Sequence, residues 1–176
     1  MKRLGIIGEG FSEETFAHMQ LRPHLSTYGV MAFARQIVTK RNANQKDSKG
    51  GIPSYERVRK DVLNLIGTDS ELIITTMFDL YALPKDFPGF ERAQKIEDPY
   101  SRVHLLEQSF SDDICSNRFI PYVQLHEFES LFFADVKSIH QILSLNNPKS
   151  ALLRDLERTI SEHINPKLIC LRTMPI

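Results

Sequence analysis

Tryptophan is absent from the 176-residue sequence, cysteine occurs only as Cys115 and Cys170, and positive and negative charges cancel. Zero net charge excludes a strongly basic nucleic-acid coat, although not a local basic patch. No apolar run approaches the ~20 residues of a membrane-spanning helix, and the apolar stretch after Lys2-Arg3 is too short for a signal peptide. Two distant cysteines, in no metal or redox spacing, predict isolated buried thiols in a cytoplasmic protein. Without a long apolar run, we expect no membrane partner.

What is present is an alternation of apolar and amphipathic segments. The apolar runs predict strands at 4–8, 30–39, 72–78 and 119–125. Helices are expected after a Ser12 cap, with a bend or restart at Pro23, over 54–66, from Asp98-Pro99 onward, and at 136–144 and 149–163. Such alternation predicts an α/β fold, with a mostly parallel four-stranded sheet flanked by helices in one domain over residues 1–176.

Acidic residues stand where several of these strands end. Glu9 follows the first strand, Asp79 ends the run "LIITTMF", and Glu127 and Glu129 follow "FIPYVQL". The carboxyl ends of parallel strands meet at one edge of a sheet, and sites collect there. Glu13 lies one helical turn beyond Glu9. Because clustered carboxylates repel unless a cation neutralises them, the pattern predicts a site for Mg²⁺ or Mn²⁺.

Other site patterns are incomplete. A dinucleotide fingerprint needs a third glycine where Glu13 stands, and no phosphate-binding Gly-Lys-Ser/Thr loop occurs. His126-Glu127 lacks the second histidine of a zinc-protease helix, because Ser130 occupies that position. No Gly-x-Ser-x-Gly nucleophile turn is present. An oxygen-ligand metal site is what remains.

Each candidate also has a plain structural interpretation. Glu9 and Asp79 could cap turns, and Glu13 and Glu14 suit the dipole of a helix N-terminus. Glu127 and Glu129 are two residues apart, so at most one is expected to reach the site. Tyr81 is either a core residue or a hydrogen-bond donor to a phosphate. Basic residues that either face solvent or hold a nucleic-acid backbone are Lys40, Arg41, Lys49, Arg57 and Lys60.

The opening "IIGEGFSEETF" resembles the first motif of Toprim domains, especially those of the overcoming-lysogenization-defect nucleases. The wider set "GEGFSEETF", "GGIPSYERVRKD", "TTMFDLYALPKDFPG", "DPYSRV" and "HEFESLFF" is similar to a Toprim-like bacterial family that includes RloG-type proteins. This resemblance spans about residues 3–167. It implies a three-layer Toprim-like sandwich. Related proteins continue beyond "NPKLICLRTMPI", so a C-terminus shorter than in those relatives is expected.

The resemblance also implies roles for particular residues. Glu9 matches the Toprim glutamate, a metal ligand or general acid and base, and Asp79 matches the first aspartate of Asp-x-Asp. Tyr81 replaces the second aspartate. Glu13 matches the second acid of the nuclease branch, and Glu127 or Glu129 is our substitute for the missing ligand.

The function expected from this resemblance is Mg²⁺-dependent hydrolysis of DNA or RNA in a phage-defence or restriction-linked system, with an ATPase as partner. A homo-oligomer is left open. The alternative is a non-catalytic Toprim-like module that binds metal or phosphate or scaffolds a partner. A Glu9 carboxylate held by backbone amides would favour that module.

Overall fold

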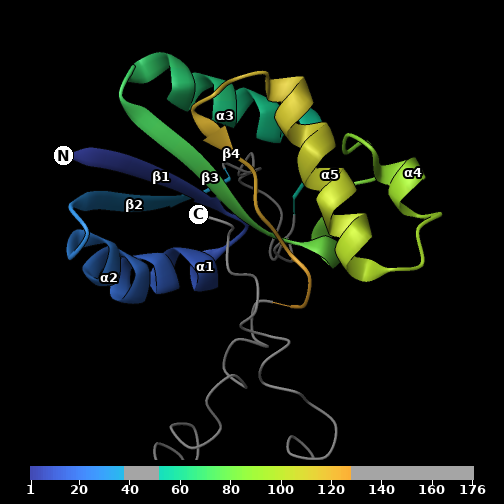
Figure 1. The fold of residues 1–176 in the computed structure, drawn as a ribbon, viewed down its shortest axis with the longest axis horizontal. Coiled ribbons are helices and arrows are strands. Elements are labelled where there is room, and N and C mark those ends of the chain that lie inside the picture. The colour runs from blue at the N-terminus through green and yellow to red at the C-terminus, as the bar shows by residue number, and fades with distance from the viewer. Residues whose placement is uncertain (38–51, 128–176) are drawn as a thin grey trace, which may run out of the picture. The chain divides into compact units, whose positions relative to one another are not determined.

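The computed structural model describes residues 1–37 and 52–127 (Figure 1). The chain divides into two compact units, Met1–Leu125 and His126–Ile176. Of the second unit the structure describes only His126 and Glu127, so the expected helices at 136–144 and 149–163 lie outside the described residues. The expectation of a single domain over 1–176 stays a prediction.

The first unit is built on a sheet in which every strand pairing is parallel. The strand order is β2-β1-β3-β4, and β5 also pairs with β3. This confirms the predicted α/β fold with a mostly parallel sheet of about four strands, and it is consistent with a Toprim-like sandwich. The strands are β1 (Lys2–Gly8), β2 (Val30–Gln36), β3 (Leu72–Asp79), β4 (Phe119–Ile120) and β5 (Val123–Gln124).

Helices cover both faces of this sheet (Figure 1). The segments after β1 lie on one face, while α3 and α5 lie on the other. The helices are α1 (Phe11–Phe16), the π-helix η1 (Ala17–Leu21), α2 (Arg22–Ser26), α3 (Tyr55–Thr68), the 3-10 helix η2 (Leu80–Ala82), α4 (Phe90–Ala93) and α5 (Pro99–Ile114). Pro23 lies in the first turn of α2, which follows the π-helix η1 without a break, so the predicted bend or restart at Pro23 stays a prediction.

Two apolar layers follow from the alternation of side chains along the strands. Ile7 is fully buried in the larger cluster, together with Val58 of α3 and Phe110 of α5. Its neighbour Ile6 belongs to a smaller cluster with Ala17. Adjacent residues of β1 therefore serve opposite layers, which explains why "LGIIG" is apolar without alternation.

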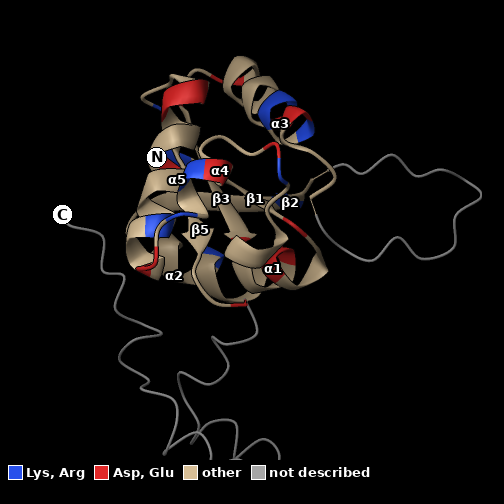
Figure 2. Ribbon diagram, turned by 90° about the vertical axis from the view of Figure 1, so that its right-hand side faces the viewer, with Lys and Arg blue, Asp and Glu red and all other residues tan. Residues whose placement is uncertain are grey.

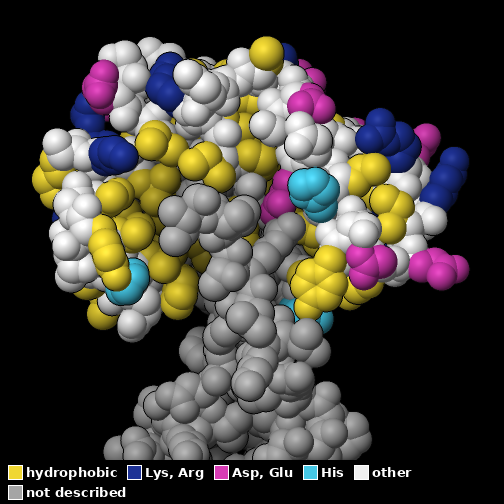
Figure 3. All heavy atoms as spheres, in the orientation of Figure 1, with side chains coloured by type: hydrophobic (Ala, Val, Ile, Leu, Met, Phe, Trp, Pro, Cys, Tyr) yellow, Lys and Arg dark blue, Asp and Glu magenta, His cyan; other side chains and the backbone are white. Residues whose placement is uncertain are grey.

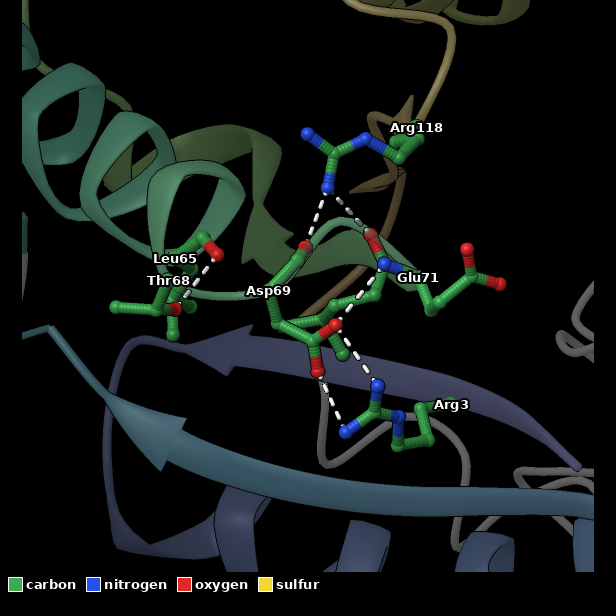
Figure 4. Close-up of polar contacts among 7 residues, drawn as sticks. Arg3, Leu65, Thr68, Asp69, Glu71 and Arg118 are labelled. Carbon is green, nitrogen blue, oxygen red and sulfur yellow. Dashed lines mark hydrogen bonds and ion pairs between the residues drawn. The ribbon is translucent and has the colours of Figure 1, made fainter.

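The amino edge of the sheet is held by arginines (Figure 4). Arg118 donates to the Asp69 carbonyl at 2.5 Å. Its other terminal nitrogen donates to the Ile66 carbonyl at 3.1 Å. Arg3 forms a two-point contact with the Asp69 carboxylate, at 2.6 and 2.8 Å. These contacts connect the end of α3 to the starts of β1 and β3, at the opposite end of the strands from the predicted acidic site.

Several local predictions need correction. The first helix is capped by Gly10, whose backbone is extended, so Ser12 lies inside α1 and not at its cap. The run 119–125 is not one strand. It forms two short pieces, because Pro121 has no backbone N–H to donate to a ladder. The strand predicted for 30–39 ends at Gln36, and residues 38–39 lie outside the described residues.

The expectation of buried thiols is wrong for Cys115, which is exposed. Cys115 is the C-cap of α5 and has a left-handed backbone, with φ of 51°. Cys170 lies outside the described residues. Within residues 1–37 and 52–127, no helix has the length and apolar character needed to cross a membrane.

Hydrophobic side chains gather over the β1–β2 side of the molecule in the view of Figure 3. In the same part of the sequence, Met31 of β2 and Tyr28 before it are 47% and 72% exposed. β2 is an edge strand, which leaves part of its apolar surface uncovered.

Candidate functional site

Glu9 and Asp79 converge at the carboxyl edge of the sheet. β1 and β3 are neighbours, with Gly8 opposite Met77, so Glu9 leaves β1 beside the last residues of β3. The Asp79 backbone N–H donates a hydrogen bond to Glu9 Oε1 at 2.5 Å. The prediction that these two acids share one edge is confirmed.

Glu13 lies against the turn that carries Glu9. It is the third residue of α1, and its Oε2 accepts a hydrogen bond of 2.9 Å from the Gly10 N–H. A Cβ at position 8 would lie 2.8 Å from Glu13 Cβ, which is closer than real Cβ contacts come. Glycine at position 8 therefore lets α1 fold back onto the end of β1, and the Glu13 carboxylate caps its own helix.

Burial of these acids costs free energy, because charged carboxylates lose hydration when they leave water. Glu13 and Asp79 are each 8% exposed, and Glu9 is half-buried. Carboxylates removed from water need hydrogen bonds, a cation or a proton to offset the lost hydration. The backbone amides of Gly10 and Asp79 supply part of that compensation.

In the described ranges, no three Asp, Glu, His or Cys side chains are grouped so that they could hold a metal ion. Glu9, Glu13 and Asp79 therefore do not form a three-ligand cup by themselves. Glu9 and Asp79 follow adjacent strand ends, and their contact is between the Glu9 carboxylate and the Asp79 backbone N–H. Mg²⁺ is commonly bound through one or two carboxylates plus waters and substrate phosphates. The metal assignment stays a prediction.

Glu14 has a different environment. Its Oε2 accepts a hydrogen bond of 2.7 Å from Gln36 Nε2, which links α1 to the end of β2. This contact agrees with its interpretation as a surface acid in the first turn of a helix.

The remaining predicted residues are dispersed. Glu127 is exposed and belongs to the second unit, as does His126. Arg57 and Lys60 both lie on α3, with Lys60 exposed. Tyr81 is 70% exposed, so its interpretation as a core residue is wrong. Predicted residues that lie outside the described ranges are Lys40, Arg41, Lys49 and Glu129.

The structure places Gln124 beside Asp79, a neighbour that sequence reasoning missed. Gln124 ends β5 in register with Asp79, is 7% exposed, and its Oε1 accepts a hydrogen bond from the Tyr122 hydroxyl. Thr76 holds the same segment, because its Oγ1 bonds to both the N–H and the carbonyl of Tyr122, at 3.0 and 2.9 Å. A polar residue at the end of the apolar run "FIPYVQL" was the available signal.

The fold and this edge define an α/β protein with a parallel sheet and an acid pair where β1 and β3 end. The chain belongs to the family described as domain of unknown function DUF4276, whose model matches residues 8–173. The match includes Glu9, Glu13 and Asp79, and the family description assigns no activity. No curated protein matches the chain.

Proposed function

We propose that the chain is a Toprim-like hydrolase that cleaves phosphodiester bonds of nucleic acid with the help of Mg²⁺ or Mn²⁺. The observation that carries the proposal is that Glu9 and Asp79 lie together at the ends of adjacent parallel strands, where the Asp79 N–H donates to the Glu9 carboxylate. Two acids from segments that are 70 residues apart in the sequence meet at the edge where parallel-sheet proteins bind ligands.

Glu9 and Asp79 are the residues that would hold the cation, with Glu13 in the same turn and Glu127 or Glu129 as further candidate ligands. When bound, a divalent cation polarises a phosphoryl oxygen and lowers the pKa of a water. Carboxylate oxygens are the donor type that Mg²⁺ and Mn²⁺ prefer. We assign catalytic roles to Glu9 and Asp79. Glu127 belongs to the second unit, and its catalytic role stays a prediction from the sequence.

The chain's own backbone orients these acids. The Asp79 N–H fixes one oxygen of Glu9, and the Gly10 N–H fixes one oxygen of Glu13. Hydrogen bonds of this kind hold metal-ligating carboxylates in one orientation. Gly8 keeps the turn compact, so that β1 and α1 present both glutamates from a single short segment.

The wider setting is part of the same proposal. A chain with zero net charge has little long-range attraction for nucleic acid, so a partner that grips the substrate, such as an ATPase, would complement it. We place the protein in the cytoplasm, in phage defence or a restriction-linked system, on the strength of the RloG-type resemblance.

A non-catalytic module is the second candidate, and specific contacts favour it. Glu9 accepts from a backbone amide, Glu13 caps its own helix, and Tyr81 stands where Toprim enzymes have a second aspartate. Such a protein would bind metal or phosphate without cutting.

The test compares Glu9→Gln and Asp79→Asn with the wild type. Both substitutions keep side-chain size and remove one negative charge. Metal at about 100 times its Kd should stabilise the wild type by ~2.7 kcal/mol, and the two variants much less. Thermal melts with and without Mn²⁺ measure this. Cleavage of labelled DNA and RNA should fall more than ~100-fold, which corresponds to ~3 kcal/mol of lost transition-state stabilisation.

Glu14→Gln is the matched control, because it removes the same charge from α1, five residues after Glu9 in the sequence and outside the acid pair. It should keep both the Mn²⁺ response and the activity. Equal Mn²⁺ stabilisation of all four proteins would show that the metal does not bind at Glu9 and Asp79. Metal binding that depends on Glu9 and Asp79, without cleavage of any strand, would establish the non-catalytic module.

A further inference from the structure

α3 contains a buried carboxylate that the acid pair does not account for. Asp61 is 3% exposed and lies one turn from Val58 and Leu65, which pack in the core. Two arginines approach it. Arg57 Nε is 3.6 Å from Oδ2, and Arg35 of β2 places a terminal nitrogen 3.8 Å from Oδ1. A buried carboxylate needs such positive charge to remain ionised.

These ion pairs are longer than hydrogen bonds, which measure about 2.7–3.2 Å between N and O. Arg57 Nε is also buried without a hydrogen-bond partner. Arginines with a structural role here behave differently. Arg59 donates to Asp113 at 2.8 Å, and Arg118 donates to backbone carbonyls at 2.5 and 3.1 Å. Both arginines thus lie within ion-pair distance of Asp61, and the Nε–H of Arg57 makes no hydrogen bond there.

The three side chains carry an excess of one positive charge, because two guanidiniums face one carboxylate. Figure 2 shows basic and acidic residues next to each other along the ribbon of α3. The side chains of Arg35 and Arg57 are 36% and 29% exposed, so part of each is in contact with solvent, although Arg57 Nε is buried.

Their place in the sheet connects them to the candidate site. Arg35 is in register with Ile7, two residues before Glu9, near the carboxyl end of β2. Arg57 lies in the first turn of α3, directly after the Ser54 cap. Cations therefore stand on the carboxyl side of the sheet beside the strand that delivers Glu9.

We propose that Arg35 and Arg57, held by the buried Asp61, bind a backbone phosphate of the nucleic acid. The fork of N–H donors in a guanidinium matches phosphate oxygens, and a phosphodiester carries the single negative charge that the group lacks. Such contacts position a strand without reading its sequence. The inference rests on the proposed function for the identity of the ligand, and it adds Arg35 and Asp61 to the site.

The experiment measures binding of fluorescent single-stranded DNA and RNA oligonucleotides by anisotropy. It is done in EDTA, so that no cleavage occurs, and over a range of salt concentrations. Arg35→Ala and Arg57→Ala should each weaken binding about tenfold and lower the slope of log K against log salt by about one. Arg35→Lys and Arg57→Lys keep the charge beside Asp61 and should bind more tightly than the alanine variants but less tightly than the wild type.

Arg59→Ala is the matched control. It removes the same charge from the same helix, at a guanidinium that is already hydrogen-bonded to Asp113. Its affinity and salt slope should equal those of the wild type. Circular dichroism of each variant establishes that the fold is retained.

The inference is overturned if Arg59→Ala weakens binding as much as the other alanine variants, or if the wild type binds no oligonucleotide at low salt. Oligonucleotide binding that depends on Arg35 and Arg57, without Mn²⁺-dependent cleavage, would remove the proposed hydrolysis and keep the phosphate site. If the arginine variants cleaved nucleic acid with an unchanged KM, the proposed hydrolysis would stand and the phosphate site at Arg35 and Arg57 would be excluded.

Discussion

At the scale of single residues, Gly8 determines whether Glu9 and Glu13 can share one turn. The strand backbone at Gly8 is held in register on both sides, opposite Gln36 and Met77, so it cannot easily move away from α1. Gly8→Ala would place a methyl group 2.8 Å from Glu13 Cβ. We expect a loss of ~1–3 kcal/mol in the free energy of unfolding, measured by urea denaturation, as for other overpacked sites.

Gly67→Ala provides the control for that measurement. Nothing lies within 4 Å of a Cβ at position 67, which is in the last turn of α3. Alanine favours helix over glycine by up to ~1 kcal/mol, so this variant should be as stable as the wild type or more stable. If Gly8→Ala matched it, the close contact between β1 and α1 would not exist.

At the scale of elements, α5 begins with a cap whose strength depends on pH. The Asp98 carboxylate accepts from the side chain and the backbone N–H of Ser101, at 2.5 and 2.8 Å. These hydrogen bonds hold the pKa of Asp98 below its usual value. Its contribution to stability is therefore present above the pKa of the unfolded chain and is lost as the pH falls through the folded pKa.

Asp98→Asn tests this cap, because asparagine can accept similar hydrogen bonds without a titrating charge. The wild type should exceed the variant in stability near neutral pH. This difference should shrink as the pH falls below about 4, the usual range of aspartate. Urea denaturation of both proteins at several pH values measures it. Because Asp98 is exposed, the effect should be small and reduced by salt. A pH-independent difference would contradict the assignment.

At the scale of the whole first unit, one aromatic side chain joins the layers above the sheet. Phe110 of α5 is fully buried, and its ring packs against the rings of Tyr55, Phe78, Phe87 and Phe119. These partners come from α3, β3, β4 and the segment before α4. Phe110→Ala should cost ~3–5 kcal/mol in the free energy of unfolding, through lost burial and the cavity left behind.

Tyr100→Ala is the comparison for this variant, on the same helix. Tyr100 is 42% exposed, so its removal should change stability by no more than ~0.5 kcal/mol. Denaturant unfolding measures the free energy of unfolding of both variants. Equal stability of the two proteins would show that Phe110 does not join these elements.

The elements of the fold and the placement of Glu9 and Asp79 at one edge were predictable from the sequence. Apolar runs gave β1 and β3, the amphipathic segment 54–66 gave α3, and Asp98-Pro99 marked the start of α5. Because parallel strands end at the same edge, the sequence could place Glu9 and Asp79 on one edge of the sheet. Their direct contact follows from β1 and β3 being neighbours in the strand order. Predictions for residues outside the described ranges, such as Glu129, stay untested.

Other features were decided only by the tertiary structure. The neighbour of Asp79 is Gln124, because β5 pairs with β3 in that register, and strand order and register depend on long-range packing. Arg35 of β2 meets Asp61 because α3 lies on one face of the sheet and Asp61 is within ion-pair distance of that arginine. Gly8 is required by contact with Glu13, not by its own backbone conformation. A local pattern specifies which element forms, but partners across the sheet arise from the joint burial of surfaces that are distant in sequence.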